Sequence, residues 1–270
     1  MAQPEPVRLV PGGAVDRPAE QALLAAAAAC DGDVDAMVEL LRAASGAASG
    51  EDAAPLDLPL TGAGRTREQW ELLASVAAQD LSAARVLEPH LDALSILSQA
   101  GVPAPAGLLG VYASESGGRT PALRPAPDGP DTAWLLDGEK PWCSLAAAVL
   151  PGREAHGPRR AVLVDLSHPG VAETDSAWPA LGLAPIRTVG LAFDAVPGNA
   201  VGGAEWYLRR PGFAWGGIGV AAVWFGGAVG IARTLRNATA ARAAAEAEGR
   251  GPGPDLSLIH ISEPTRPRLI

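Results

Sequence analysis

The chain has 270 residues, of which 48% are apolar and 19% charged, and its formal net charge is −9 at pH 7. This composition suffices for one large or two modest hydrophobic cores and excludes an intrinsically disordered chain. The acidic balance argues against general binding to nucleic acid or to anionic membranes, so neither is an expected partner. Two cysteines, Cys30 and Cys143, cannot form a disulfide framework and suit a reducing cytoplasm, the expected location.

Residues 1–103 are predicted to form an N-terminal helical domain. Apolar residues recur at helical spacing over 19–29, 34–44 and 66–100, where Thr66 is the expected N-cap and Pro89 the expected break or kink. Residues 1–18 are rich in Pro and Gly, and residues 45–64 form a low-complexity linker. Both of these stretches are therefore expected to be loose.

The pattern changes in residues 104–212, which are predicted to form a compact middle β domain. Short runs such as LLGVYAS, TAWLLDG, RAVLVDL and TVGLAFDAV are rich in β-branched and aromatic residues and are separated by Gly, Pro and Asp. Asp137-Gly138 is a tight-hairpin signal, because glycine accepts a positive φ.

Phe213 to Ala232 is a run of twenty residues without a charge. Its length and polarity meet the criterion for a transmembrane helix. The alternative is a core helix whose glycines allow close backbone approach. Strong helix formers continue the pattern afterwards and favour one long soluble helix over 213–250, the first helix of a C-terminal helical domain.

Residues 251–270 are expected to be a non-native or disordered tail. Residues 256–270 contain no Ala and no Gly and hold three of the seven isoleucines of the chain. Residues 256–266 also resemble the translation of a transposase-type sequencing adapter. We therefore expect the native sequence to continue beyond about Asp255, so that the chain is a truncated piece of a longer protein.

General motif analysis does not identify an active site. Apart from His260, which lies in the adapter-like segment, the chain has three histidines: His90, His156 and His168. They lack metal-ligand spacing, so no metal site is expected. The sequence also contains no nucleophile elbow, no P-loop and no dinucleotide-binding glycine motif.

Three segments of the β domain carry a more specific signal. GVYASESGG, WLLDGEKPWCSLA and LGLAPIRTVGLAFDAVPGNAVG resemble, in order and spacing over about 108–203, the middle domain of the acyl-CoA dehydrogenase family. Residues 213–248 resemble the first long helix of that family's C-terminal domain. The resemblance implies an α+β fold with an N-terminal helical domain, a central antiparallel β-barrel-like domain and the start of a C-terminal helical bundle.

The resemblance also implies a flavin site with FAD as the cofactor. The positions that match the family's flavin contacts are Val111, Ala113, Ser114, Trp142 and Ser144. The two serines stand where the family has threonines, and they keep a hydroxyl that can donate and accept hydrogen bonds.

Gly118 and Arg119 are the expected substrate-binding residues, with the Arg119 guanidinium directed at a CoA phosphate. The implied reaction is α,β-dehydrogenation of an acyl-CoA thioester with hydride transfer to FAD. An electron-transfer flavoprotein or a similar acceptor is the implied partner, and the complete protein is expected to be a homo- or hetero-oligomer. No catalytic residue is assigned, because the family's carboxylate base lies on a later helix, and the chain by itself is expected to be inactive.

Two departures from the family pattern keep other functions open. The segment ESGGRTPAL differs from the family's usual turn, and the helix at 213–232 carries no charge where the family has an Asp and an Arg. One alternative is a non-catalytic, FAD-binding partner subunit of a heteromeric acyl-CoA dehydrogenase. The other is a flavin-dependent monooxygenase of the same fold.

Overall fold

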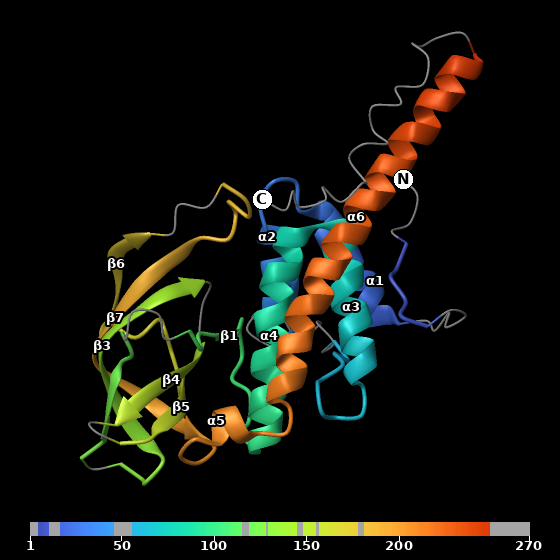
Figure 1. Ribbon diagram of the computed structural model, residues 1–270. Helices are drawn as coiled ribbons and strands as arrows, with labels where there is room; N and C mark the ends of the chain where they lie inside the picture. Colours follow the sequence, from blue (N-terminus) through green and yellow to red (C-terminus); the bar gives the residue numbers. More distant parts are fainter. Residues whose placement is uncertain are drawn as a thin grey trace, which may run out of the picture. The chain divides into compact units, whose positions relative to one another are not determined.

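The computed structural model describes residues 5–10, 17–45, 56–114, 119–127, 129–144, 148–154, 157–177 and 181–248. The chain divides into two compact units, residues 1–227 and residues 228–270. The first unit contains four long helices, a β-sheet and the beginning of a fifth long helix (Figure 1). The predicted tail at 251–270 lies outside the described residues.

The helices of the N-terminal part are α1 (Pro18–Ala29), α2 (Asp35–Ala44), α3 (Thr66–Gln79) and α4 (Leu81–Ala100). Their apolar faces meet in one core, in which Leu23, Met37 and Leu41 are fully buried. The helices predicted over 19–29 and 34–44 are thus confirmed to within one residue, because their hydrophobic spacing matches the face that each buries.

The stretch predicted over 66–100 is broken at Asp80 rather than at Pro89. The Asp80 carboxylate accepts a hydrogen bond from the Ala83 N–H at 2.7 Å and so caps α4. Pro89 lies inside α4, where burial of the helix face outweighs the one backbone hydrogen bond that proline removes. Thr66, predicted as an N-cap, is instead the first helical residue of α3.

Residues 5–10 belong to the segment predicted to be loose, and they are anchored on α3. The Val7 side chain is buried, and its N–H donates to the Ser75 hydroxyl at 2.8 Å. The Leu9 N–H donates to the Glu71 carboxylate at 3.2 Å. Composition reports local propensity and carries no signal for such long-range bonds.

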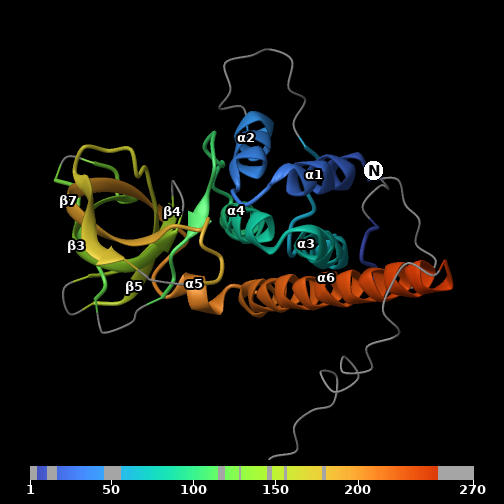
Figure 2. The ribbon, with the colours of Figure 1, turned by 90° about the horizontal axis from the view of Figure 1, so that it is seen from above.

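One sheet contains seven strands. They are β1 (Gly110–Val111), β2 (Ala122–Pro125), β3 (Ala133–Ser144), β4 (Ala148–Glu154), β5 (Arg159–Val164), β6 (Val171–Ala177) and β7 (Thr188–Val201). Strands β4, β2, β3, β7 and β5 pair in that order, and β5 pairs again with β4, so five strands close a ring (Figure 2). Strand β1 pairs with β4, and β6 with β7.

The ring confirms the predicted antiparallel, barrel-like domain. Among its pairings only those of β4 with β1 and with β2 are parallel. The interior is mostly apolar, with Leu136, Val162 and Val196 fully buried, and it also contains the buried Lys140 side chain of β3. Because a closed ring has few free edges, the barrel protects its backbone polar groups from solvent and from other chains.

The hairpin predicted at Asp137-Gly138 is wrong. Strand β3 runs through both residues, and β7 has one extra residue opposite them. That residue, Ala195, adopts a left-handed φ of 48°, and its N–H donates to the Asp137 carboxylate at 2.8 Å. The Asp-Gly pair therefore serves a β-bulge, with Gly138 at a φ of 107°, instead of a turn.

A short helix, α5 (Trp206–Arg209), leads into α6 (Phe213–Ala247). This confirms the prediction of one long helix. Within the described part of the chain, α6 is the helix long and apolar enough to cross a membrane by length and composition. Its buried residues are Gly219, Val223 and Gly226, and those two glycines lie against Leu73 and Ala74 of α3.

Gly226 provides a test of the contact between α6 and α3. A Cβ at this position would overlap the Ala74 carbonyl oxygen and lie 2.7 Å from the Ala74 Cα. We expect Gly226→Ala to lower the free energy of unfolding by about 1–3 kcal/mol through overpacking.

Gly217 is the matched control, because a Cβ there meets nothing within 4 Å. Gly217→Ala should raise stability by up to about 1 kcal/mol, the usual gain for alanine over glycine in a helix. Thermal and urea unfolding of both variants measures the difference. Equal stability of the two variants would contradict the close approach of α6 to α3.

His90 joins the helices to the sheet. Its Nδ1 accepts a hydrogen bond at 3.1 Å from the N–H of Leu109, the residue before β1. The ring is 1% exposed, and burial lowers the pKa of His90 to about 4 from an ordinary value of 6.5. The imidazole is therefore neutral near pH 7 and keeps the lone pair that holds Leu109.

This pKa predicts a pH dependence of stability. The folded-state pKa lies below the unfolded one, so the contribution of His90 is complete above about pH 6.5 and is lost as the pH falls toward about 4, by up to about 3 kcal/mol. His90→Asn keeps an acceptor oxygen and does not titrate. We expect the difference in unfolding free energy between the wild type and this variant to shrink over that window. A constant difference would show that His90 is not held neutral.

Candidate functional site

Tyr112 brings two of the sequence-predicted segments together. It follows β1, and its hydroxyl donates to the Ser144 carbonyl oxygen, at the end of β3, at 2.9 Å. Burial raises the pKa of Tyr112 well above its usual range, so the phenol remains a protonated donor. This bond places the run from Val111 to Ser114 beside the end of β3, which carries Trp142.

Trp142 occupies a second β-bulge. Strand β3 has one residue more than β7 between Lys140 and Cys143. Trp142 takes a left-handed φ of 59°, a conformation that costs of order 1 kcal/mol for a residue other than glycine. Its side chain is 40% exposed, whereas Lys140 and Cys143 are buried. Trp142 is therefore not a core aromatic: a strained backbone presents its ring outside the barrel.

The Ser144 hydroxyl is paired with that of Thr188, the first residue of β7. The two oxygens are 2.6 Å apart, and either can be the donor. The Thr188 hydroxyl also lies 3.4 Å from the Ile186 carbonyl oxygen. Sequence reasoning missed Thr188. The signal that would have found it is the register of β3 with β7, in which Ser144 and Thr188 are directly opposite.

The other predicted site residues lie on the surface or outside the described residues. Ala113 and Ser114 are exposed at the end of the β1 segment. Arg119 forms an exposed ion pair with Glu139 of β3, at 3.5 Å. Gly118, the other predicted substrate contact, falls outside the described residues. In the described ranges, no group of three or more His, Cys, Asp or Glu side chains is placed to hold a metal ion.

The arrangement offers an aromatic face, hydroxyl groups and exposed backbone within one short region. Trp142 supplies the ring, and the Ser144–Thr188 pair can present either a proton or a lone pair. Such a surface suits a flat, heteroaromatic ligand that carries both hydrogen-bond donors and acceptors along its edge.

No sequence profile of a known family matches the chain, and no characterised protein matches it in sequence. Solved structures do resemble it. Butyryl-CoA dehydrogenase from Megasphaera elsdenii is 18% identical, with a TM-score of 0.56, over 78% of this chain and 66% of that one. KijD3 in complex with FMN and a dTDP-linked amino-keto sugar is 19% identical, with a TM-score of 0.63, over 94% of this chain and 69% of that one.

The nitrososynthase from Micromonospora carbonacea var. africana is 19% identical, with a TM-score of 0.59, over 97% of this chain and 72% of that one. At such identities the likeness concerns the fold. The present chain spans 66% of the length of the butyryl-CoA dehydrogenase. The order of helices, closed sheet and long helix is therefore that of the acyl-CoA dehydrogenase fold.

Proposed function

We propose that the chain is part of a flavin-dependent oxidoreductase and that the outer face of the β3 end, together with the segment after β1, holds the flavin. The observation that carries the proposal is the exposed Trp142 on its left-handed bulge. Backbone strain of this kind clusters at binding sites, where the surrounding structure maintains it. The Tyr112–Ser144 bond and the long pairing of β3 with β7 are that surrounding structure.

The residues present fit FAD or FMN. Trp142 offers a ring against which an aromatic system can pack, and the backbone of Val111 to Ser114 offers polar groups beside it. When Thr188 donates to Ser144, the Ser144 proton is available to a ligand acceptor. When Ser144 donates to Thr188, its oxygen is available to a ligand donor. A bound flavin would supply hydride acceptance, which protein side chains cannot.

The leading reaction is α,β-dehydrogenation of an acyl-CoA thioester, with an electron-transfer flavoprotein or a similar acceptor as partner. It is supported by the sequence resemblance and by the fold shared with butyryl-CoA dehydrogenase. No described residue is assigned as the base that removes the α-proton. Homo- or hetero-oligomeric assembly, cytoplasmic location and continuation beyond about Asp255 stay predictions.

A flavin-dependent monooxygenase is the second candidate. The uncharged first part of α6 favours it, because the residues that reach acyl-CoA in the family include an Asp and an Arg. KijD3 and the nitrososynthase, which are similar to this chain over 94% and 97% of its length, do not carry the dehydrogenase name. A partner subunit that binds FAD without catalysis is compatible with the same site.

Trp142→Gly separates binding from stability. Glycine accepts the left-handed backbone and relieves about 1 kcal/mol of strain, but the covered part of the ring is lost, so we expect a folded variant whose unfolding free energy falls by about 1–3 kcal/mol. Loss of the ring should weaken the binding of FAD and FMN at least tenfold, measured by flavin fluorescence titration. Trp224→Ala, which removes an exposed tryptophan of α6, is the matched control and should leave flavin affinity unchanged. The proposal fails if the wild-type chain binds neither flavin, or if Trp142→Gly binds as tightly as wild type.

The two reactions are distinguished on flavin-loaded protein that includes the expected continuation beyond about Asp255, because the chain by itself is expected to be inactive. Anaerobic bleaching of the flavin absorbance by butyryl-CoA supports dehydrogenation. Oxygen consumption that requires pre-reduced flavin, without bleaching by butyryl-CoA, supports monooxygenation. Flavin binding with neither response leaves the partner-subunit alternative.

A further inference from the structure

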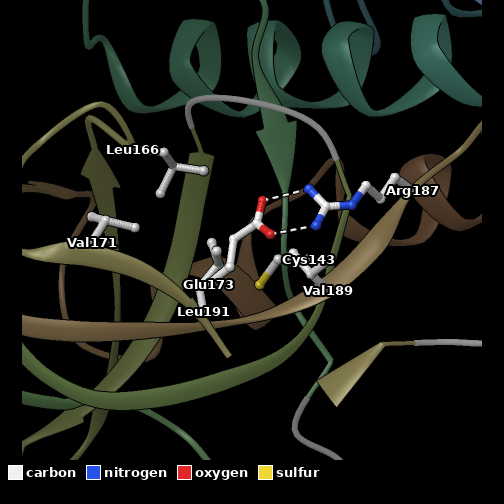
Figure 3. Close-up of a pocket in the computed structure, with 7 residues that line it drawn as sticks. All are labelled: Cys143, Leu166, Val171, Glu173, Arg187, Val189 and Leu191. Atoms are coloured by element: carbon white, nitrogen blue, oxygen red, sulfur yellow. Dashed lines mark hydrogen bonds and ion pairs between the residues drawn. The ribbon is translucent and has the colours of Figure 1, made fainter. Parts of the chain in front are cut away.

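A half-open cavity of about 340 Å³ lies between β3, β6 and β7. Five of its lining side chains are apolar or carry a thiol: Cys143, Leu166, Val171, Val189 and Leu191. The remaining two, Glu173 and Arg187, form an ion pair. Figure 3 shows this pair beside Cys143, with Leu166 and Val171 on the other side of Glu173. The volume falls in the range of pockets that hold small ligands.

The cavity is separate from the proposed flavin contacts. Successive side chains of a strand point to opposite faces. Trp142 and Ser144 are exposed or half-buried, whereas Cys143 between them is 2% exposed and belongs to the barrel core. The cavity therefore opens on the inner side of β3, and the flavin contacts lie on its outer side.

The lining carries no net charge. The Arg187 guanidinium donates two hydrogen bonds to the Glu173 carboxylate, at 2.7 and 2.5 Å, so each charge is neutralised by the other. Burial raises the pKa of the Cys143 thiol to about 12, so the thiol is uncharged near pH 7. With apolar side chains on the remaining surface, an ionic ligand would lose its hydration without gaining a partner.

The ion pair lies at the solvent-exposed edge of the cavity. The side chains of Glu173 and Arg187 are 49% and 72% exposed. Because the cavity is half-open, a small molecule can enter it while the pair stays formed.

We propose that this cavity binds a compact, uncharged, apolar molecule. The site does not depend on a flavin, and it stands or falls independently of the proposed oxidoreductase function.

Two fluorescent probes that differ by one sulfonate test the proposal. N-phenyl-1-naphthylamine is neutral, and 8-anilino-1-naphthalenesulfonate is its anionic counterpart. We expect the full chain to bind one neutral probe per chain and to bind the anionic probe at least tenfold more weakly. Lys140 is buried near Cys143 but does not line the cavity. Equal or tighter binding of the sulfonate would show that the Lys140 charge acts there and would overturn the assignment to neutral ligands.

Val171→Phe fills the cavity from β6 and should weaken binding of the neutral probe at least tenfold. Val220→Phe adds the same bulk to the exposed apolar surface of α6 and is the matched control, which should bind as the wild type does. Loss of binding in Val220→Phe alone would place the probe on α6 and refute the cavity.

A second measurement covers the case in which Val171→Phe does not fold. In a Cys30→Ser background Cys143 is the only thiol of the chain. We expect the neutral probe to slow modification of Cys143 by methyl methanethiosulfonate at least fivefold. Absence of stoichiometric binding, or binding that leaves the modification rate unchanged, overturns the proposal.

Discussion

The pairing of β3 with β7 constrains the rest of the barrel. It contains two bulges of opposite sense. In the first bulge the extra residue is Ala195 on β7. In the second bulge the extra residue is on β3, at Trp142 or beside it. The first moves β7 by one residue relative to β3, and the second moves it back. The second bulge therefore restores the pairing register of β3 with β7. On β3 itself the buried inward positions are even-numbered up to Lys140, and the extra residue moves the next one to Cys143, so this bulge shifts the alternation of β3 by one residue. Without it, Cys143 and its neighbours would exchange faces.

This shift in the alternation explains how one short segment serves two environments. Cys143 completes the apolar interior, and Trp142 and Ser144 are presented outward. The end of β1 is held against this segment by Tyr112 and against α4 by the bond between His90 and Leu109. The outer surface proposed for the flavin is thus positioned by these two hydrogen bonds and by the backbone pairing of β3 with β7.

Hydrophobic periodicity was sufficient to predict the helices and a compact β domain, because each element buries one face. The antiparallel, barrel-like arrangement was predicted from the resemblance to the acyl-CoA dehydrogenase family. Local signals were less reliable. An Asp-Gly pair suits a bulge as well as a hairpin turn, because both need a glycine with a positive φ. Only the pairing with the partner strand decides between the two structures. The exposure of Trp142 and the role of Thr188 both depend on register, which a single strand does not contain. The anchoring of Val7 on Ser75 joins residues 68 positions apart and has no local signature.

Lys140 is the only lysine of the sequence, and it is fully buried between the two bulges. Every other basic side chain except histidine is a guanidinium, so no lysine amine is available at the surface. Amine-directed acylation therefore reaches a lysine of this protein only when the barrel opens. The rate at which Lys140 gains an acyl group, followed by mass spectrometry, therefore reports how often the barrel opens. The arginine side chains at the surface do not react with the amine-directed reagent.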